Sequence, residues 1–341
     1  MDRIFKTSIM FAAVAFCAVS CSKWTEQQAV DFKYITLEEK NPALYNSYLA
    51  SLRDFRESEH QVIIVRVDNR ATIPVGRAEH LNSIPDSVDF VVLNNPSQIS
   101  ETHLAEIAEL RAKKDQKFLA AISFAALDKA YGLYVEDLDP AAEPETEEVF
   151  IGRKVEEFLG YFTNAELDGI LASYIGKSPA AMRQDEKDAV KSLQEAFLAP
   201  IYTRISSTGK TFFFEGNAKN LLVDEDVLGA ARYIIVPLES ETSAKSFDNA
   251  ILNMLAEGVP DDKFIAGVTA LDVTDSQAVN GFFSGETSAV TGAARWAVNP
   301  GPGVSKCGVC VNHAQFDYYH IGNDYREIRT AISIMNPSPY K

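Results

Sequence analysis

Residues 166–176 read ELDGILASYIG and contain the fourth of eight short runs rich in β-forming residues. The other seven runs occupy residues 62–67, 88–93, 118–124, 211–215, 233–238, 264–271 and 306–312. Several are continuously apolar, such as VIIV at 62–65, FVVL at 90–93 and YIIV at 233–236. Runs of this kind are typical of strands buried on both faces of a parallel sheet.

Segments with helical character separate these strands, notably 103–114, 147–162, 185–204 and 247–257. Eight alternating strand and helix units predict an α/β protein whose single domain is a closed (β/α)8 TIM barrel. An open doubly wound sheet is the alternative, but it usually carries a glycine-rich turn after its first strand, where Asp68-Asn69-Arg70 stands here. The acidic stretch 136–148 is expected to be a solvated loop between the third strand and its helix.

The amino-terminal segment predicts a bacterial lipoprotein signal. Arg3 and Lys6 precede an apolar stretch at 8–19 that ends in Ala18-Val19-Ser20-Cys21. This stretch is shorter than the roughly 20 residues that span a bilayer, and a small residue before cysteine marks cleavage. We therefore expect a signal peptide at 1–20, lipidated Cys21 with a tether to residue 40, and the barrel at 41–341. The expected location is the bacterial outer membrane, at the cell surface, with the periplasmic face left open.

Charge and cysteine content narrow the classes of partner. The formal net charge is −16 and no basic cluster is present, which argues against a nucleic-acid partner. Of the four cysteines, Cys307 and Cys310 have CxxC spacing within a predicted strand. Residues three apart on a strand point to opposite faces, so packed core thiols are expected instead of a disulfide or metal site. Neither a metal nor another cofactor is expected.

Polar residues stand where the predicted strands end, at the barrel edge that carries binding sites in this fold. They include Asp68, Asn69, Asn94, Asn95, Ser123, Ser173, Glu215, Asn217, Glu239, Asp272, Asn312 and Gln315. Carboxylates and amides without histidine or cysteine clusters suit sugar hydroxyls better than a transition metal. Capping of the following helices is the alternative role for each asparagine or aspartate.

The 166–176 segment resembles strand four of glycoside hydrolase family 18, the chitinases and endo-β-N-acetylglucosaminidases, which carries Asp-Gly-x-Asp-x-Asp-x-Glu. Asp168-Gly169 matches the start of this motif, but Leu171, Ser173 and Ile175 stand where the two later aspartates and the glutamate are expected. The resemblance is closest to the family 18 barrels of Bacteroidetes lipoproteins in glycan-uptake systems. The lead-in YLASLR at 48–53 and the endings FDYY at 316–319 and YREIR at 325–329 also fit that group.

The resemblance implies a degenerate catalytic motif. In the active family the glutamate protonates the glycosidic oxygen while the substrate acetamide attacks the anomeric carbon. Ile175 cannot donate a proton, and loss of general acid catalysis costs about 10²- to 10⁴-fold in rate. No carboxylate lies between Asp168 and Asp185, so a shift in alignment does not restore the motif.

The sequence therefore predicts a pseudoenzyme that binds glycans, of N-acetylglucosamine-containing or mannose-rich N-glycan type, for uptake at the cell envelope. The candidate ligand-binding residues are Asn69, Asn95, Tyr174, Glu215, Asn217, Glu239, Asp272, Trp296, Gln315 and Phe316. For Trp296 the alternative is a helix residue packed on the barrel. Two other functions stay open: an active glycosidase whose acid has moved to Glu215 or Glu239, and a scaffold for an outer-membrane transporter or glycan-binding partner that binds no sugar.

Overall fold

A computed structural model describes residues 35–71, 73–275, 277–285, 287–301, 303–320 and 322–338. The predicted signal peptide, Cys21 and most of the tether lie outside these residues. The chain divides into two units, 1–48 and 49–341. The first contains helix α2 (Leu37–Lys40), capped by Thr36, and the start of α3 (Pro42–Glu57). Helix α2 falls at the end of the predicted tether.

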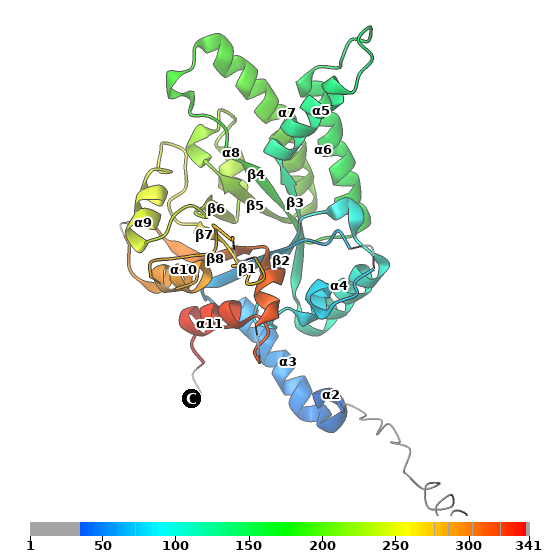
Figure 1. The fold of residues 1–341 in the computed structure, drawn as a ribbon, viewed down its shortest axis with the longest axis vertical. Coiled ribbons are helices and arrows are strands. Elements are labelled where there is room, and N and C mark those ends of the chain that lie inside the picture. The colour runs from blue at the N-terminus through cyan, green and yellow to red at the C-terminus, as the bar shows by residue number, and fades with distance from the viewer. Residues whose placement is uncertain are drawn as a thin grey trace, which may run out of the picture. The chain divides into compact units, whose positions relative to one another are not determined.

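The second unit is a closed barrel of eight parallel strands in sequential order, as the sequence predicts (Figure 1). The strands are β1 (Val62–Val67), β2 (Phe90–Leu93), β3 (Lys117–Ser123), β4 (Gly169–Tyr174), β5 (Thr211–Gly216), β6 (Tyr233–Pro237), β7 (Phe264–Thr269) and β8 (Lys306–Asn312). Strand β8 pairs with β1 and closes the barrel. All eight expected strands are confirmed, with ends that shift by up to two residues.

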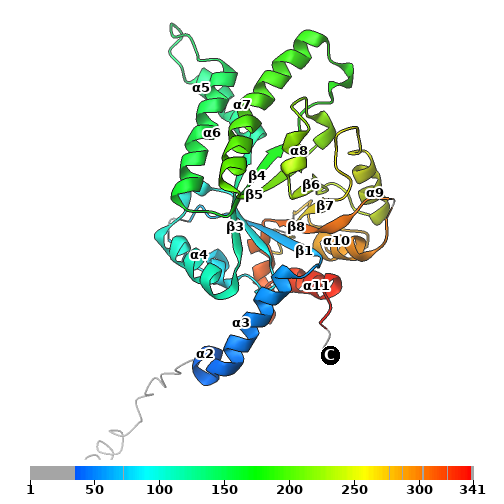
Figure 2. The same cartoon turned by 180° about the vertical axis from the view of Figure 1, so that it is seen from behind.

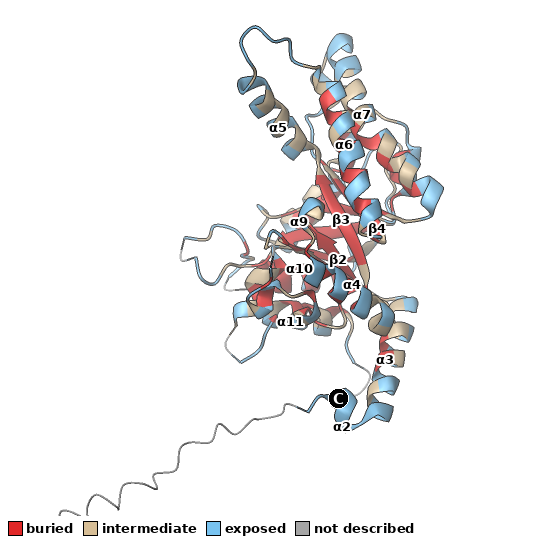
Figure 3. Cartoon of the chain, turned by 90° about the vertical axis from the view of Figure 1, so that its right-hand side faces the viewer, coloured by how far each residue is buried: buried red, intermediate tan, exposed pale blue. Residues whose placement is uncertain are grey.

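Alternate residues of each strand belong to two separate apolar clusters. The inner cluster fills the barrel with side chains such as Ile64, Leu171 and Phe213. The outer cluster packs the other strand face, with Ile63, Ile170 and Phe212, against the surrounding helices. Both faces are therefore apolar, which explains the continuous runs in the sequence. Figure 3 shows the strands as the most buried elements.

The described helices that follow β2 are α4 (Glu101–Lys114), α5 (Phe124–Glu136), α6 (Glu147–Asn164), α7 (Gln184–Thr208), α8 (Asp226–Ala230), α9 (Ala244–Leu252), α10 (Ala289–Val298) and α11 (Arg326–Met335). Four of the expected helices are present, although α9 begins and ends earlier than predicted. Helix α5, which the sequence reading missed, follows β3 directly and is capped by Ser123. The acidic loop therefore joins α5 to α6 instead of following the strand.

Helices α5, α6 and α7 extend past the carboxyl ends of β3 and β4, on one side of the barrel mouth (Figures 1 and 2). None of the α5 residues is fully buried, whereas α6 buries Phe150, Val155, Phe158 and others. The apolar face of α5, with Phe124, Leu127, Tyr131 and Tyr134, packs against the outer cluster but stays partly exposed.

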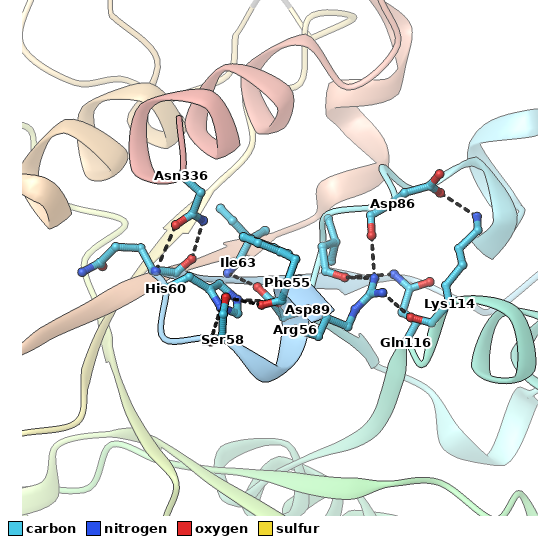
Figure 4. Close-up of polar contacts among 12 residues, drawn as sticks. Phe55, Arg56, Ser58, His60, Ile63, Asp86, Asp89, Lys114, Gln116 and Asn336 are labelled. Atoms are coloured by element: carbon cyan, nitrogen blue, oxygen red, sulfur yellow. Dashed lines mark hydrogen bonds and ion pairs between the residues drawn. The ribbon is translucent and has the colours of Figure 1, made fainter. Parts of the chain in front are cut away.

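A polar network lies at the amino end of the barrel (Figure 4). His60 lies before β1, with its Nδ1 atom 2.7 Å from the Ser58 carbonyl oxygen and its Nε2 atom 2.9 Å from Asp89 Oδ1. The other Asp89 oxygen accepts the Ile63 backbone N–H at 2.8 Å. Arg56 donates to backbone carbonyls before β2 and β3, including that of Val88 at 3.1 Å. These contacts tie the ends of α3, β1 and β2 together.

Strand β8 contains a bulge that corrects the expectation for its cysteines. The register shifts between Phe264 and Ile265 of β7, where Lys306 and Gly308 are the partners. Gly308 has φ of +149°, and a Cβ atom there would lie 1.9 Å from the Val62 carbonyl oxygen. Because of this extra residue, Cys307 and Cys310 both pack with the inner cluster, so the opposite-face expectation is wrong. Both are free thiols, as expected.

Candidate functional site

The centre of the barrel mouth is occupied by an ion pair that crosses from β1 to β5. Arg66 Nη1 donates to both carboxylate oxygens of Glu215, at 2.7 and 2.6 Å. The side chains are 16% and 7% exposed, respectively, so the pair is largely shielded from water. Arg66 Nε also donates to Asn94 Oδ1 at 3.1 Å, which fixes the guanidinium toward β2. An ion pair that is largely shielded from water therefore forms the floor of the mouth.

The β6 to β8 side of the mouth contains a second carboxylate, Glu239, which is bound by an amide instead of a cation. Glu239 Oε1 accepts a hydrogen bond of 2.6 Å from Asn312 Nδ2. Burial raises the pKa of Glu239, and the negative charge of Glu215 adds to this effect. Glu239 therefore holds a proton more readily than an exposed glutamate does.

The strand-four positions that the sequence singled out lie beside this floor. Leu171 is in the inner cluster, so Ser173, two residues further, also faces the barrel interior. Ser173 is the register partner of Glu215 on β5. Ile175 follows the strand and is 52% exposed at the mouth. An alkyl side chain thus lies where the family motif would place its acid.

Two of the predicted aromatic contacts are located elsewhere. Tyr174 is 4% exposed and faces outward from the barrel, where its ring packs on Phe124 and its hydroxyl accepts from Gln194 Nε2 at 2.8 Å. Trp296 is 2% exposed in α10, packs on Phe247, and donates to Asp248 at 2.8 Å. Neither ring is available for stacking on a sugar at the mouth, so both predictions are corrected. Tyr174 is buried because alternation along β4 points it away from the barrel interior. Trp296 is buried because it lies on the apolar face of α10.

Three predicted amide and carboxylate residues have roles within the loops. Asn69 is 2% exposed, and it donates to and accepts from the Asn95 backbone at 2.8 and 2.9 Å. Asn95 in turn donates to Asp68 at 2.9 Å. Asp272 accepts from the Thr274 backbone and hydroxyl at 2.9 and 2.6 Å, which lowers the pKa of its carboxyl. These residues shape the β1, β2 and β7 loops.

Four other predicted residues lie at the carboxyl ends of β5, β6 and β8, namely Glu215, Asn217, Glu239 and, after Asn312, Gln315. The backbone N–H of Asn217 donates to the Tyr174 carbonyl oxygen at 3.2 Å, which holds Asn217 directly after the end of β5. The Asn312 Oδ1 and Gln315 Oε1 atoms are buried, and neither accepts a hydrogen bond from the part of the chain that the structure describes. Two acceptors near the mouth are therefore buried without a donor among the described residues.

Phe316 belongs to the 3-10 helix η6 (Ala314–Tyr319), which follows β8. Its ring is partly exposed and stacks on His313, with the ring centroids 5.3 Å apart and the planes 15° apart. Of the three predicted aromatic residues, this one has an accessible ring beside the mouth.

Arg66 is a residue of the site that the sequence analysis did not identify. It stands in VIIVRV, two residues after inward-facing Ile64, so its side chain also points into the barrel. A buried arginine requires a carboxylate partner. The inward-facing residue of FFFE on strand five, Glu215, was the available partner, and the alternation of both strands could have identified the pair.

Within the described residues, no group of three histidine, cysteine, aspartate or glutamate side chains is placed to hold a metal ion. No described helix has both the length and the apolar character needed to cross a membrane.

Comparison with known proteins gives one family match. The family described as "Glycoside hydrolase family 18, BT1044-like" matches residues 25–334. Among curated proteins none matches the sequence.

Solved structures with a similar fold include a selenomethionine form of BT1044, at 16% identity and a TM-score of 0.63, with coverage of 88% of this chain and 95% of that one. An endo-β-N-acetylglucosaminidase from Cordyceps militaris is 14% identical with a TM-score of 0.56, covering 85% of this chain and 96% of its own. A family 18 chitinase from Chromobacterium violaceum is 14% identical with a TM-score of 0.50, covering 81% and 84%. At these identities the comparisons support a shared fold.

Proposed function

Because the chain belongs to the BT1044-like group of glycoside hydrolase family 18, we propose that it is a family member that binds glycans at its barrel mouth without cleaving them. The observation that carries the proposal is the chemistry of strand four, where Leu171, Ser173 and Ile175 replace the carboxylates of the family motif. Substrate-assisted hydrolysis needs an acid for the leaving oxygen and a carboxylate to steady the acetamide. This strand supplies neither.

The mouth nevertheless has groups suited to sugars. The partly exposed Phe316 ring offers an apolar face, and the side-chain amides of Asn217, Asn312 and Gln315 are of the chemical type that forms hydrogen bonds with sugar hydroxyls. The Arg66–Glu215 pair is charge-compensated and rigid, so it presents a neutral floor. N-glycans rich in mannose or N-acetylglucosamine are the ligand class that we assign, with capture for uptake at the cell envelope as the biological role.

Binding and turnover can be measured in one experiment. The full chain, purified in detergent, is incubated with high-mannose N-glycans, complex N-glycans and chito-oligosaccharides; calorimetry measures binding and mass spectrometry measures released product. We expect binding without product. Phe316→Ala should weaken binding about fivefold, since a ring contact of this kind contributes on the order of 1 kcal/mol. Leu133→Ala, at a 53% exposed position on α5, is the control.

Release of product at an appreciable rate would refute the proposal. Binding to none of the glycans would favour a scaffold role in an outer-membrane transport complex. Glu215→Ala is not a suitable binding variant, because it would leave the Arg66 charge without its partner.

One observation favours a second function, an active glycosidase that uses Glu239 as its acid. Burial raises the pKa of Glu239, which is the property that a general acid needs near neutral pH. Glu215 is less suited to that role because Arg66 binds both of its oxygens. If turnover occurs, Glu239→Gln should abolish it while glycan binding persists; turnover that survives this substitution excludes Glu239 as the acid.

A further inference from the structure

A cavity lies beside the mouth, between the carboxyl ends of β2 and β3 and one face of α6. Its volume is about 290 Å³, which is close to the lower limit of about 300 Å³ for small-molecule pockets. We call it the side cleft and define it by Arg66, Asn94, Ala126, Lys154, Phe158 and Tyr161. Arg66 and Asn94 also border the mouth, whereas the other four residues take no part in the mouth contacts described above.

One face of α6 forms the wall of the side cleft. Lys154, Glu157, Phe158 and Tyr161 have i, i+3, i+4 and i+7 spacing, which places them on the same side of a helix. Glu157 accepts from Lys154 Nζ at 2.8 Å and from the Tyr161 hydroxyl at 2.9 Å, and these bonds lower its pKa. The Tyr161 ring, 36% exposed, is therefore held in a fixed position at the edge of the cavity.

The rest of the lining combines apolar and polar surface. Ala121, Ile122 and Leu127 contribute carbon atoms, while Asn94 and Ser123 bring an amide and a hydroxyl. Asn94 Oδ1 is engaged by Arg66, and no hydrogen bond from its Nδ2 group is found within the described part of the chain. A ligand that fits must be amphipathic, with an apolar face and groups that form hydrogen bonds.

The charges around the side cleft are paired. Arg66 is neutralised by Glu215, and Lys154 by Glu157. A phosphate or sulfate group would find no unpaired cation among these residues, and a cationic ligand would compete with Lys154 for Glu157. The charge balance favours a neutral ligand.

We propose that the side cleft binds one neutral sugar unit of the glycan held at the mouth, with that unit packed against the Tyr161 ring. The proposal rests on the proposed function, and it adds a second contact area and a preference for uncharged branches. Arg66 borders both sites, so a branched glycan can occupy them together.

Substitutions on α5 provide a matched test. Ala126 lines the side cleft, whereas its neighbour Ala125 does not, and both are exposed. Ala126→Trp fills the cavity and should weaken binding of a neutral high-mannose glycan at least tenfold, while Ala125→Trp should stay within twofold of the wild type. Tyr161→Ala should also weaken binding, and Val149→Ala, on an exposed position of the same helix, is its control. Thermal unfolding checks that each variant is folded.

The outcomes separate the two proposals. If the wild type binds no glycan, the proposed function fails and the present inference fails with it. If the wild type binds but Ala126→Trp and Tyr161→Ala bind equally well, only the side cleft assignment is overturned. A sialylated glycan that binds more tightly than its neutral counterpart, and loses this advantage in Ala126→Trp, would overturn the preference for an uncharged unit.

Discussion

Arg66 and Glu215 are largely buried, so removal of either one leaves the other charge without compensation. We expect Glu215→Ala to lower the free energy of unfolding by about 3 kcal/mol. The double variant Arg66→Met with Glu215→Leu removes both charges and should recover most of this loss. Lys191→Ala, which breaks an exposed pair with Glu195, should change stability by less than about 1 kcal/mol.

Urea unfolding of the four proteins measures these differences. A Glu215→Ala variant as stable as the wild type would show that the pair contributes little to folding.

His60 is predicted to make stability depend on pH. Both of its ring nitrogens face oxygen acceptors, Ser58 O and the Asp89 carboxylate, so the doubly protonated ring satisfies both contacts. The hydrogen bond with Asp89 raises the pKa of His60 above 6.5, burial and the Arg56 charge opposing it. Because the folded pKa is raised, the stabilisation is complete below pH 6.5 and is lost as the pH rises through the folded pKa.

The difference in unfolding free energy between the wild type and His60→Gln should therefore be largest near pH 5 and decrease toward pH 9. Asp89→Asn should remove the same pH dependence. A difference that stays constant from pH 5 to pH 9 would contradict the assignment of a charged ring.

At the scale of single elements, the bulge in β8 depends on glycine. A Cβ atom at Gly308 would collide with the Val62 carbonyl oxygen, and its φ of +149° is strained for other residues. Gly308→Ala should lower the unfolding free energy by about 2 kcal/mol or more. Gly152→Ala is the control, because this α6 position has no atom within 4 Å of the added methyl group and alanine favours helices by about 1 kcal/mol. Equal urea midpoints for the two variants would refute the argument.

The strands were predictable from sequence because both of their faces are apolar, as in VIIV of β1 and YIIV of β6. Helix α5 was less apparent in the sequence, because its core-facing side is only partly buried and its solvent side also carries apolar residues, Leu133 and Val135. The side on which Cys307 lies depends on a bulge that strand alternation alone does not reveal.

The site was predicted less completely than the fold. The positions of the strand ends predict which polar residues lie at the barrel edge, but they do not predict which side chains those residues bind. Asn69 looked like a ligand contact and instead joins two loops, whereas Arg66 looked like a strand residue and forms the floor of the mouth. These roles depend on contacts between residues far apart in the sequence, which the sequence alone does not show.

At the scale of the whole molecule, we propose that Cys21 anchors the barrel to the bacterial envelope through lipid. Cys21→Ser should move the protein from the membrane fraction to the soluble fraction of the cells, because stable attachment requires the acyl chains. Fractionation followed by immunoblotting measures this, with Cys307→Ser as the control at a free thiol. A Cys21→Ser protein that stays in the membrane fraction would contradict lipid anchoring.

The register between Ser173 and Glu215 has a consequence for substitutions in strand four. An aspartate at position 173 would lie beside the Glu215 carboxylate on the same face of the sheet, and like charges in such positions repel. Removing Glu215 first would leave the Arg66 cation alone. An acidic residue at position 173 is therefore expected to lower stability while Glu215 is present, and replacing Glu215 alone also lowers it. The Arg66–Glu215 pair thus restricts which side chains strand four can carry, whereas the loops around the mouth are free of this restriction.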